Sequence, residues 1–146
     1  MGKRPFMLLI LAMALVGAAC GDNSSETETP GASGSEAGTQ TTIGSEAANG
    51  HGSQDVSSMD EFSLEVDDFY YEPTLLTGTA GQQLTIELDN EGTVEHNFSL
   101  DEQSISQDIE AGENASVSVT FPDSGALVFY CKYHRDQGMV GGLEVA

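Results

Sequence analysis

The chain has 146 residues, enough for one domain with attached segments but not for two domains. Lys and Arg together number 4 against 24 Asp and Glu, which gives a formal net charge of −20 at pH 7. Such an acidic chain repels phosphate backbones and anionic lipid headgroups. Nucleic acid is therefore excluded as an expected partner.

The N-terminus has the pattern of a targeting segment. The cations Lys3-Arg4 precede an apolar run, Pro5 to Ala19, which is shorter than the roughly 20 residues of a spanning helix and suits a signal peptide. The run ends in Val16-Gly17-Ala18-Ala19-Cys20-Gly21, which resembles a bacterial lipobox. We expect a lipoprotein signal peptide over 1–19 and a lipid anchor on Cys20, with an uncleaved anchor or an ordinary secretory signal as the alternative.

Residues 20–59 are expected to form a lipid-anchored, low-complexity linker. Gly, Ser, Thr, Ala, Glu and Asp dominate this segment, and its only larger apolar side chains are Ile43, Val56 and Met59. A segment of this composition buries too little surface to offset the entropy of ordering it. His51 has no ligand-type neighbour, so we expect it to be solvated.

From Asp60 the apolar residues alternate with polar ones, which predicts β-strands. Turn signals recur about every ten residues, and no amphipathic helix is indicated. Residues 67–73 are expected to form an aromatic-rich turn, and residues 105–109 a looser acidic segment. The domain over 60–146 is therefore predicted to be all-β, a Greek-key β-sandwich of roughly seven strands. The clearest alternations are Phe62-Leu64-Val66, Leu84-Ile86-Leu88 and Val117-Val119-Phe121.

Four side chains have the chemistry of one metal site. Cys131, His134 and Met139 lie on one short loop between two apolar runs, and His96 lies on an earlier predicted strand. Two imidazoles, a thiolate and a long axial thioether are the ligands of a blue-copper centre. These soft donors favour copper over Mg, Ca or Mn, although zinc also binds Cys and His.

The spacing Cys-x2-His-x4-Met, with Gly138 before the Met, resembles the ligand loop of plastocyanin and related small cupredoxins. Glu95-His96-Asn97-Phe98 is similar to the first ligand motif of that family. The resemblance implies one copper ion, Cu(I) or Cu(II), and it implies that the Asn97 side chain ties the two ligand loops together. Tyr133 stands where most plastocyanins have Pro, which alters the surface around the second His.

The acidity, the lipobox and the linker resemble the membrane-anchored halocyanins and auracyanins of prokaryotes. This resemblance implies a monomeric electron carrier, not an enzyme, on the periplasmic or extracellular side of the cytoplasmic membrane. Its expected partners are redox proteins of a membrane electron-transport chain. His134 would be the electron port, and the residues expected around it, for docking, are Tyr130, Lys132, Tyr133 and Arg135.

Three other interpretations fit part of the sequence. The main alternative is a copper-storing or copper-delivering lipoprotein of the cell envelope. Hydrolytic catalysis by Cys131 with His134 fits the residue types, but no oxyanion feature accompanies them and Met139 would have no role. A metal-free adhesion sandwich would leave all four donors without a role. For the two cations, the alternative to docking is that they offset nearby acids such as Asp136.

Overall fold

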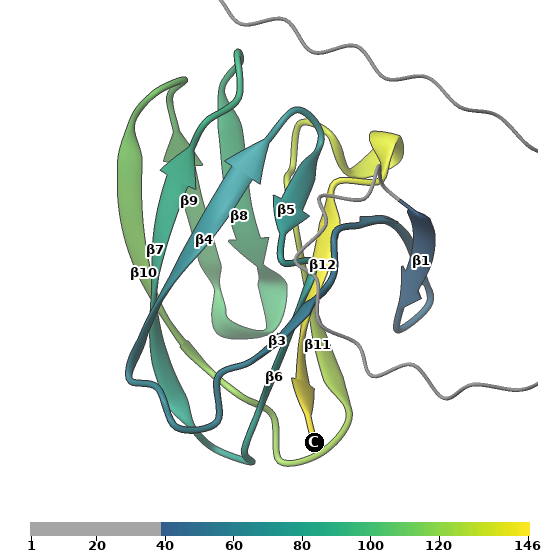
Figure 1. Ribbon diagram of the computed structural model, residues 1–146, viewed down its shortest axis with the longest axis vertical. Helices are drawn as coiled ribbons and strands as arrows, with labels where there is room; N and C mark the ends of the chain where they lie inside the picture. Colours follow the sequence, from purple (N-terminus) through teal and green to yellow (C-terminus); the bar gives the residue numbers. More distant parts are fainter. Residues whose placement is uncertain (1–38) are drawn as a thin grey trace, which may run out of the picture. The chain divides into compact units, whose positions relative to one another are not determined.

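The predicted alternation builds two packed β-sheets in residues 39–146, the part of the chain that the computed structural model describes (Figure 1). The smaller sheet has four strands in the order β10-β7-β4-β5, with β4 and β7 parallel and the other pairs antiparallel. Its strands are β4 (Glu61–Asp67), β5 (Tyr70–Glu72), β7 (Gln83–Asn90) and β10 (Asn114–Thr120).

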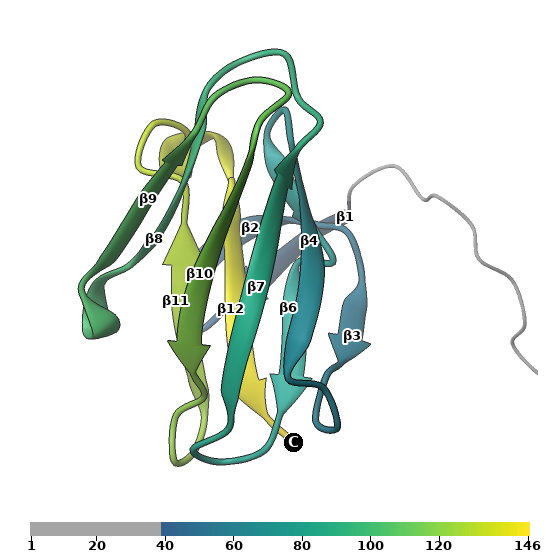
Figure 2. The ribbon, with the colours of Figure 1, turned by 90° about the vertical axis from the view of Figure 1, so that its left-hand side faces the viewer.

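The larger sheet has six strands in the order β3-β6-β12-β11-β8-β9. Figure 2 shows β10, β7 and β4 running side by side as one layer of the sandwich. Within residues 39–146, two short 3-10 helices lie outside the sheets, η1 (Asp101–Gln103) and η2 (Arg135–Gln137). The strands are β3 (Ser53–Asp55), β6 (Leu75–Gly78), β8 (His96–Leu100), β9 (Ile105–Ile109), β11 (Ala126–Tyr130) and β12 (Val140–Val145).

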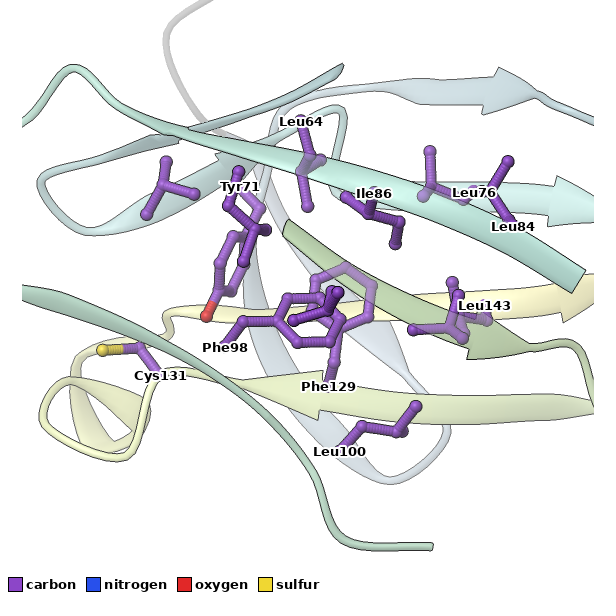
Figure 3. Close-up of a cluster of buried hydrophobic side chains, with 14 of the residues drawn as sticks. Leu64, Tyr71, Leu76, Leu84, Ile86, Phe98, Leu100, Phe129, Cys131 and Leu143 are labelled. Atoms are coloured by element: carbon purple, nitrogen blue, oxygen red, sulfur yellow. The ribbon is translucent and has the colours of Figure 1, made fainter. Parts of the chain in front are cut away.

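The two inner faces form one hydrophobic core, which confirms the predicted β-sandwich. Leu64, Ile86 and Leu88 of the smaller sheet belong to the same buried cluster as Phe98 and Phe129 of the larger one. Figure 3 shows the aromatic rings between the strands and Cys131 at one end of the cluster. The core therefore ends at the thiol that the sequence marks as a metal ligand.

The predicted linker boundary at residue 59 is wrong. Residues 39–50 form an antiparallel hairpin of β1 (Thr39–Ile43) and β2 (Glu46–Gly50), and β3 joins the larger sheet beside β6. Ile43 and Val56 are buried, so the few apolar residues of this segment suffice to attach it. Its ordering entropy is offset by this burial, by the pairing of β1 with β2 as a separate two-stranded sheet and by the pairing of β3 with β6, none of which composition alone reveals. Residues 20–38 lie outside the described part of the chain.

His51 is also not the solvated side chain that we expected. Its ring stacks on that of Tyr70 with 3.6 Å between centroids and 7° between planes, and its Nδ1 lies 3.4 Å from Glu72 Oε2. Its backbone N–H donates to Thr74 Oγ1 at 2.7 Å. His51 therefore helps to attach the N-terminal segment to the sandwich.

Two segments expected to lack regular structure are strands. β5 pairs with β4 at the edge of the smaller sheet, and β9 pairs with β8 at the edge of the larger one. Both are edge strands with few buried positions, so their apolar alternation is weak. Within residues 39–146 no helix is long and apolar enough to span a membrane. The predicted signal peptide and Cys20 lie outside this range.

Candidate metal centre

Three of the four predicted donors come together at one end of the sandwich. His96 is the first residue of β8, Cys131 directly follows β11, and His134 immediately precedes η2. One donor atom from each of the three lies within 4.8 Å of the others. His134 Nδ1 is 3.2 Å from His96 Nδ1 and 3.4 Å from Cys131 Sγ. His96 and Cys131 are fully buried, whereas His134 is half-buried.

Met139 is fully buried at the end of the same loop. The N–H of Cys131 donates to the Met139 carbonyl at 3.0 Å, and the N–H of Met139 donates to the His134 carbonyl at 3.2 Å. These two bonds hold the backbone of Met139 beside Cys131 and His134.

The shape of this loop explains the glycine before Met139. The N–H of Gln137 donates to the His134 carbonyl at 2.9 Å, closing the turn of η2. Gly138 then adopts φ 86°, a left-handed conformation that favours glycine. A Cβ at this position would also lie 2.8 Å from Asn49 Oδ1. Glycine is thus required both by the turn and by the close approach of β2.

Asn97 connects the strand of His96 to the loop that carries the other donors. Its Oδ1 accepts from the backbone N–H of Lys132 at 3.4 Å and from Ser99 Oγ at 2.5 Å, and its Nδ2 donates to Asp108 Oδ1 at 2.7 Å. The side chain is buried, so these bonds are shielded from water. The bond to Lys132 joins β8 to the segment that follows Cys131.

The structure adds two residues next to the imidazoles that the sequence did not indicate. Asp68 Oδ1 lies 2.9 Å from Nε2 of His96. The ring of Phe69 packs against both imidazoles, with centroids 4.6 Å from that of His134 and 6.2 Å from that of His96. Both residues fall in the segment read as a turn. No local signal marks Asp68, because its contact spans 28 residues of sequence.

The electrostatics of the site disfavour a free thiolate. Burial raises the pKa of the Cys131 thiol, so the thiol keeps its proton until a cation displaces it. Burial, together with the neighbouring His96, lowers the pKa of His134, so this imidazole is neutral and free to coordinate. A buried thiolate needs a positive partner, and copper held by thiolate, imidazole and thioether supplies one. The residues present therefore fit a copper ion.

Both cations expected around the site are paired with acids. Lys132 Nζ lies 2.6 Å from Asp108 Oδ1 and 4.8 Å from the centroid of the Tyr133 ring. Arg135 lies 3.2 Å from Glu46 and stacks over the ring of Tyr130 at 4.1 Å. The acids are Asp108 and Glu46, not Asp136, which the sequence had suggested as the neighbour of the two cations. Each cation also lies over the ring of one of the two tyrosines predicted near the electron port, Lys132 over Tyr133 and Arg135 over Tyr130.

Tyr133 is one of two large apolar side chains that are well exposed in the described residues. It is 45% exposed and Val94 is 39% exposed. The Tyr133 hydroxyl donates to Glu95 Oε1 at 3.2 Å, and Glu95 lies between Val94 and His96 in the sequence. Tyr133 and Val94 thus border the same end of the sandwich as the donors.

Comparison with known proteins identifies the family. The model of the cupredoxin-like domain matches residues 40–141, which is more than half of the chain. The chain belongs to the cupredoxin-like family, as the two ligand motifs had predicted. The match begins within β1, so it includes the segment that had been assigned to the linker. No curated protein sequence matches the chain.

Solved structures share the fold at low sequence identity. Reduced auracyanin from Roseiflexus castenholzii superimposes with a TM-score of 0.51 at 19% identity, covering 62% of this chain and 99% of that one. Auracyanin A, a "blue" copper protein from Chloroflexus aurantiacus, gives 0.50 at 20%, covering 59% and 98%. The metal-binding domain of a Cu(I)-exporting P-type ATPase from Streptococcus pneumoniae gives 0.53 at 15%, covering 66% and 97%.

Proposed function

We propose that this cupredoxin is a mononuclear blue-copper electron carrier with His96, Cys131, His134 and Met139 as ligands. The observation that carries the proposal is the convergence of three donor atoms within 4.8 Å at the buried end of the sandwich. Backbone hydrogen bonds to Cys131 and His134 hold Met139, the thioether residue, beside them. Two imidazoles, a thiolate and an axial thioether form a blue-copper donor set.

The bound copper would take one electron from a reduced protein partner and give it to an oxidised one, alternating between Cu(II) and Cu(I). The chain itself holds the donors. Cys131 and His96 are anchored by adjacent strands, and Asn97 connects β8 to the loop after Cys131 through the N–H of Lys132. A frame fixed by strands and buried hydrogen bonds limits movement of the ligands between the two redox states. No substrate turnover is expected of such a site.

The route for the electron would pass through the half-buried His134. Tyr133 and Val94 offer exposed apolar surface at the same end of the fold. Lys132 and Arg135 flank this end, but each is neutralised by an acid at short range. Exposed ion pairs contribute little net field. Apolar contact around Tyr133 would therefore contribute more to docking than these two charges do.

We further propose that the protein is anchored through Cys20 on the outer face of the cytoplasmic membrane and meets redox proteins there as a monomer. This part of the proposal is supported by the lipobox-like sequence alone. Cys20→Ser should release the protein from washed membranes while leaving copper binding unchanged. If the variant stays in the membrane fraction, an uncleaved apolar segment holds the protein instead.

Copper storage or delivery is the second candidate, since a domain of a Cu(I)-exporting ATPase shares the fold. The two functions differ in how tightly the copper is kept. A carrier with a buried site retains its ion through many redox cycles, whereas a delivery protein releases Cu(I) to an acceptor. The burial of His96, Cys131 and Met139 favours retention.

Voltammetry of the copper-loaded full chain tests this choice. An electron carrier should show one reversible one-electron wave at one copper per chain, unchanged after repeated cycles with a Cu(I) chelator present. Progressive loss of the wave to the chelator during reduction would favour copper delivery. A chain that takes up no copper would refute both functions.

A further inference from the structure

We propose that Asp68 is a positioning residue for the copper ligand His96 and lowers the reduction potential of the site. This inference rests on the proposed function. The Asp68 carboxylate would accept a hydrogen bond from Nε2–H of His96 and so direct Nδ1 toward the metal. A histidine bound on one side to a metal and on the other to a carboxylate is a more basic ligand.

The contact between the two side chains is short and mostly buried. Asp68 Oδ1 lies 2.9 Å from Nε2 of His96, whose side chain is fully buried, while the Asp68 side chain is 25% exposed. The opposite ring nitrogen, Nδ1, faces the donor cluster at 3.2 Å from Nδ1 of His134. The two ring nitrogens thus have different neighbours, and only the Nε2–H tautomer satisfies both.

The carboxylate is itself held in place by Thr93. The backbone N–H of Thr93 lies 3.1 Å from both carboxylate oxygens of Asp68, and its hydroxyl donates to Oδ2 at 2.5 Å. The Asp68 carboxylate therefore has a fixed orientation toward Nε2 of His96.

The loop over residues 90–94 is shaped to make room for this pair. A Cβ at Gly92 would lie 2.6 Å from Asp68 Oδ1 and 2.8 Å from His96 Nε2, so a side chain there would push the two apart. Asn90 fixes the loop, because its Oδ1 accepts from the Gly92 N–H at 3.0 Å and its Nδ2 donates to the Val94 carbonyl at 3.0 Å. The need for glycine is thus a second observation that points to the same contact.

The contact has a definite consequence for redox chemistry. A carboxylate that accepts from Nε2–H makes the imidazole a stronger electron donor through Nδ1. A stronger donor stabilises Cu(II) more than Cu(I), so the reduction potential falls. Removing the negative charge of Asp68 while keeping its shape should therefore raise the potential.

Asp68→Asn in the full chain tests the proposal. Asn retains an oxygen acceptor of similar shape, so the fold and the blue colour should persist. We expect the potential to rise by an amount that corresponds to about a tenfold greater preference for Cu(I), which is about 59 mV for one electron. Glu95→Gln is the matched control, since it removes one charge from the residue preceding His96 without touching its ring. An unchanged potential in Asp68→Asn, or equal shifts in both variants, would overturn the proposal.

A second measurement needs no copper. Nitrogen NMR of the metal-free full chain should show His96 as the Nε2–H tautomer, and Asp68→Ala or Gly92→Ala should give a tautomer mixture. An Nδ1–H tautomer in the unmutated protein, or the same spectrum in all variants, would overturn the positioning role. A chain that binds no copper would refute the proposed function, and the tautomer measurement would still decide the role of Asp68.

Discussion

In the proposed site Met139 would be the weakest of the four donors, so its replacement should change the reduction potential and keep the site. Leu has nearly the volume of Met, and such swaps in a core usually cost below about 1.5 kcal/mol. Because Met139 is fully buried, Met139→Leu should retain copper and colour. Loss of a donor to Cu(II) should raise the potential by at least about 60 mV, a tenfold change in preference. Voltammetry measures the shift, and loss of copper binding would show that Met139 is a primary ligand.

At the residue scale, the sequence predicts what local motifs encode. Cys131, His134 and Met139 lie within one loop, so their donor chemistry and spacing marked them as candidate ligands. Asp68 and Gly92 could not be predicted, because their role exists only once β4 and the loop after β7 bring them to His96. Phe69 could not be predicted either, because its contacts with the two imidazoles join residues far apart in the sequence.

At the scale of elements, the hairpin β1-β2 braces the ligand loop. The side-chain amide of Asn49 donates to the carbonyls of Gln137 at 2.9 Å and Phe69 at 3.0 Å, and its backbone N–H donates to the Gly138 carbonyl at 2.9 Å. One residue of β2 therefore connects the loop before Met139 to the segment that covers His134. This contact holds the copper end of the fold from the side of the hairpin.

Asn49→Ala should loosen this end of the protein. Removing the donor leaves two carbonyls without a protein partner, which should lower the free energy of unfolding by about 1–3 kcal/mol. Copper should also dissociate faster into a chelator. Urea unfolding and chelator kinetics measure the two effects. Asn114→Ala, at an exposed position of β10, is the control and should change neither. Equal behaviour of the two variants would show that the hairpin does not brace the loop.

The strands that the sequence did not predict include the hairpin β1-β2 and β3. β4, β7 and β10 alternate strictly and were predicted, because one face of each strand is buried. β1, β2 and β3 have few apolar residues, and their order depends on pairing with one another and with β6. Such pairing leaves little trace in composition.

At the scale of the whole molecule, charge should govern encounters. The net charge of −20 attracts cations, and Lys132 and Arg135 are both paired with acids. The reduced protein should therefore react several-fold faster with a cationic one-electron oxidant than with an anionic one of equal driving force at low salt. Stopped-flow kinetics should show the difference shrinking near 0.1 M salt, where the screening length is about 10 Å. An equal or faster reaction with the anionic oxidant at low salt would mean that a local field at the copper end dominates.

In the proposed site Cys131 binds copper as a thiolate among two imidazoles and a thioether. The most direct test is the visible absorption spectrum of the full chain loaded with one equivalent of Cu(II). We predict an intense blue band from sulfur-to-copper charge transfer, bleached by reduction and absent in Cys131→Ser. A stoichiometric Cu(II) complex of the unmutated chain without this band would contradict the account.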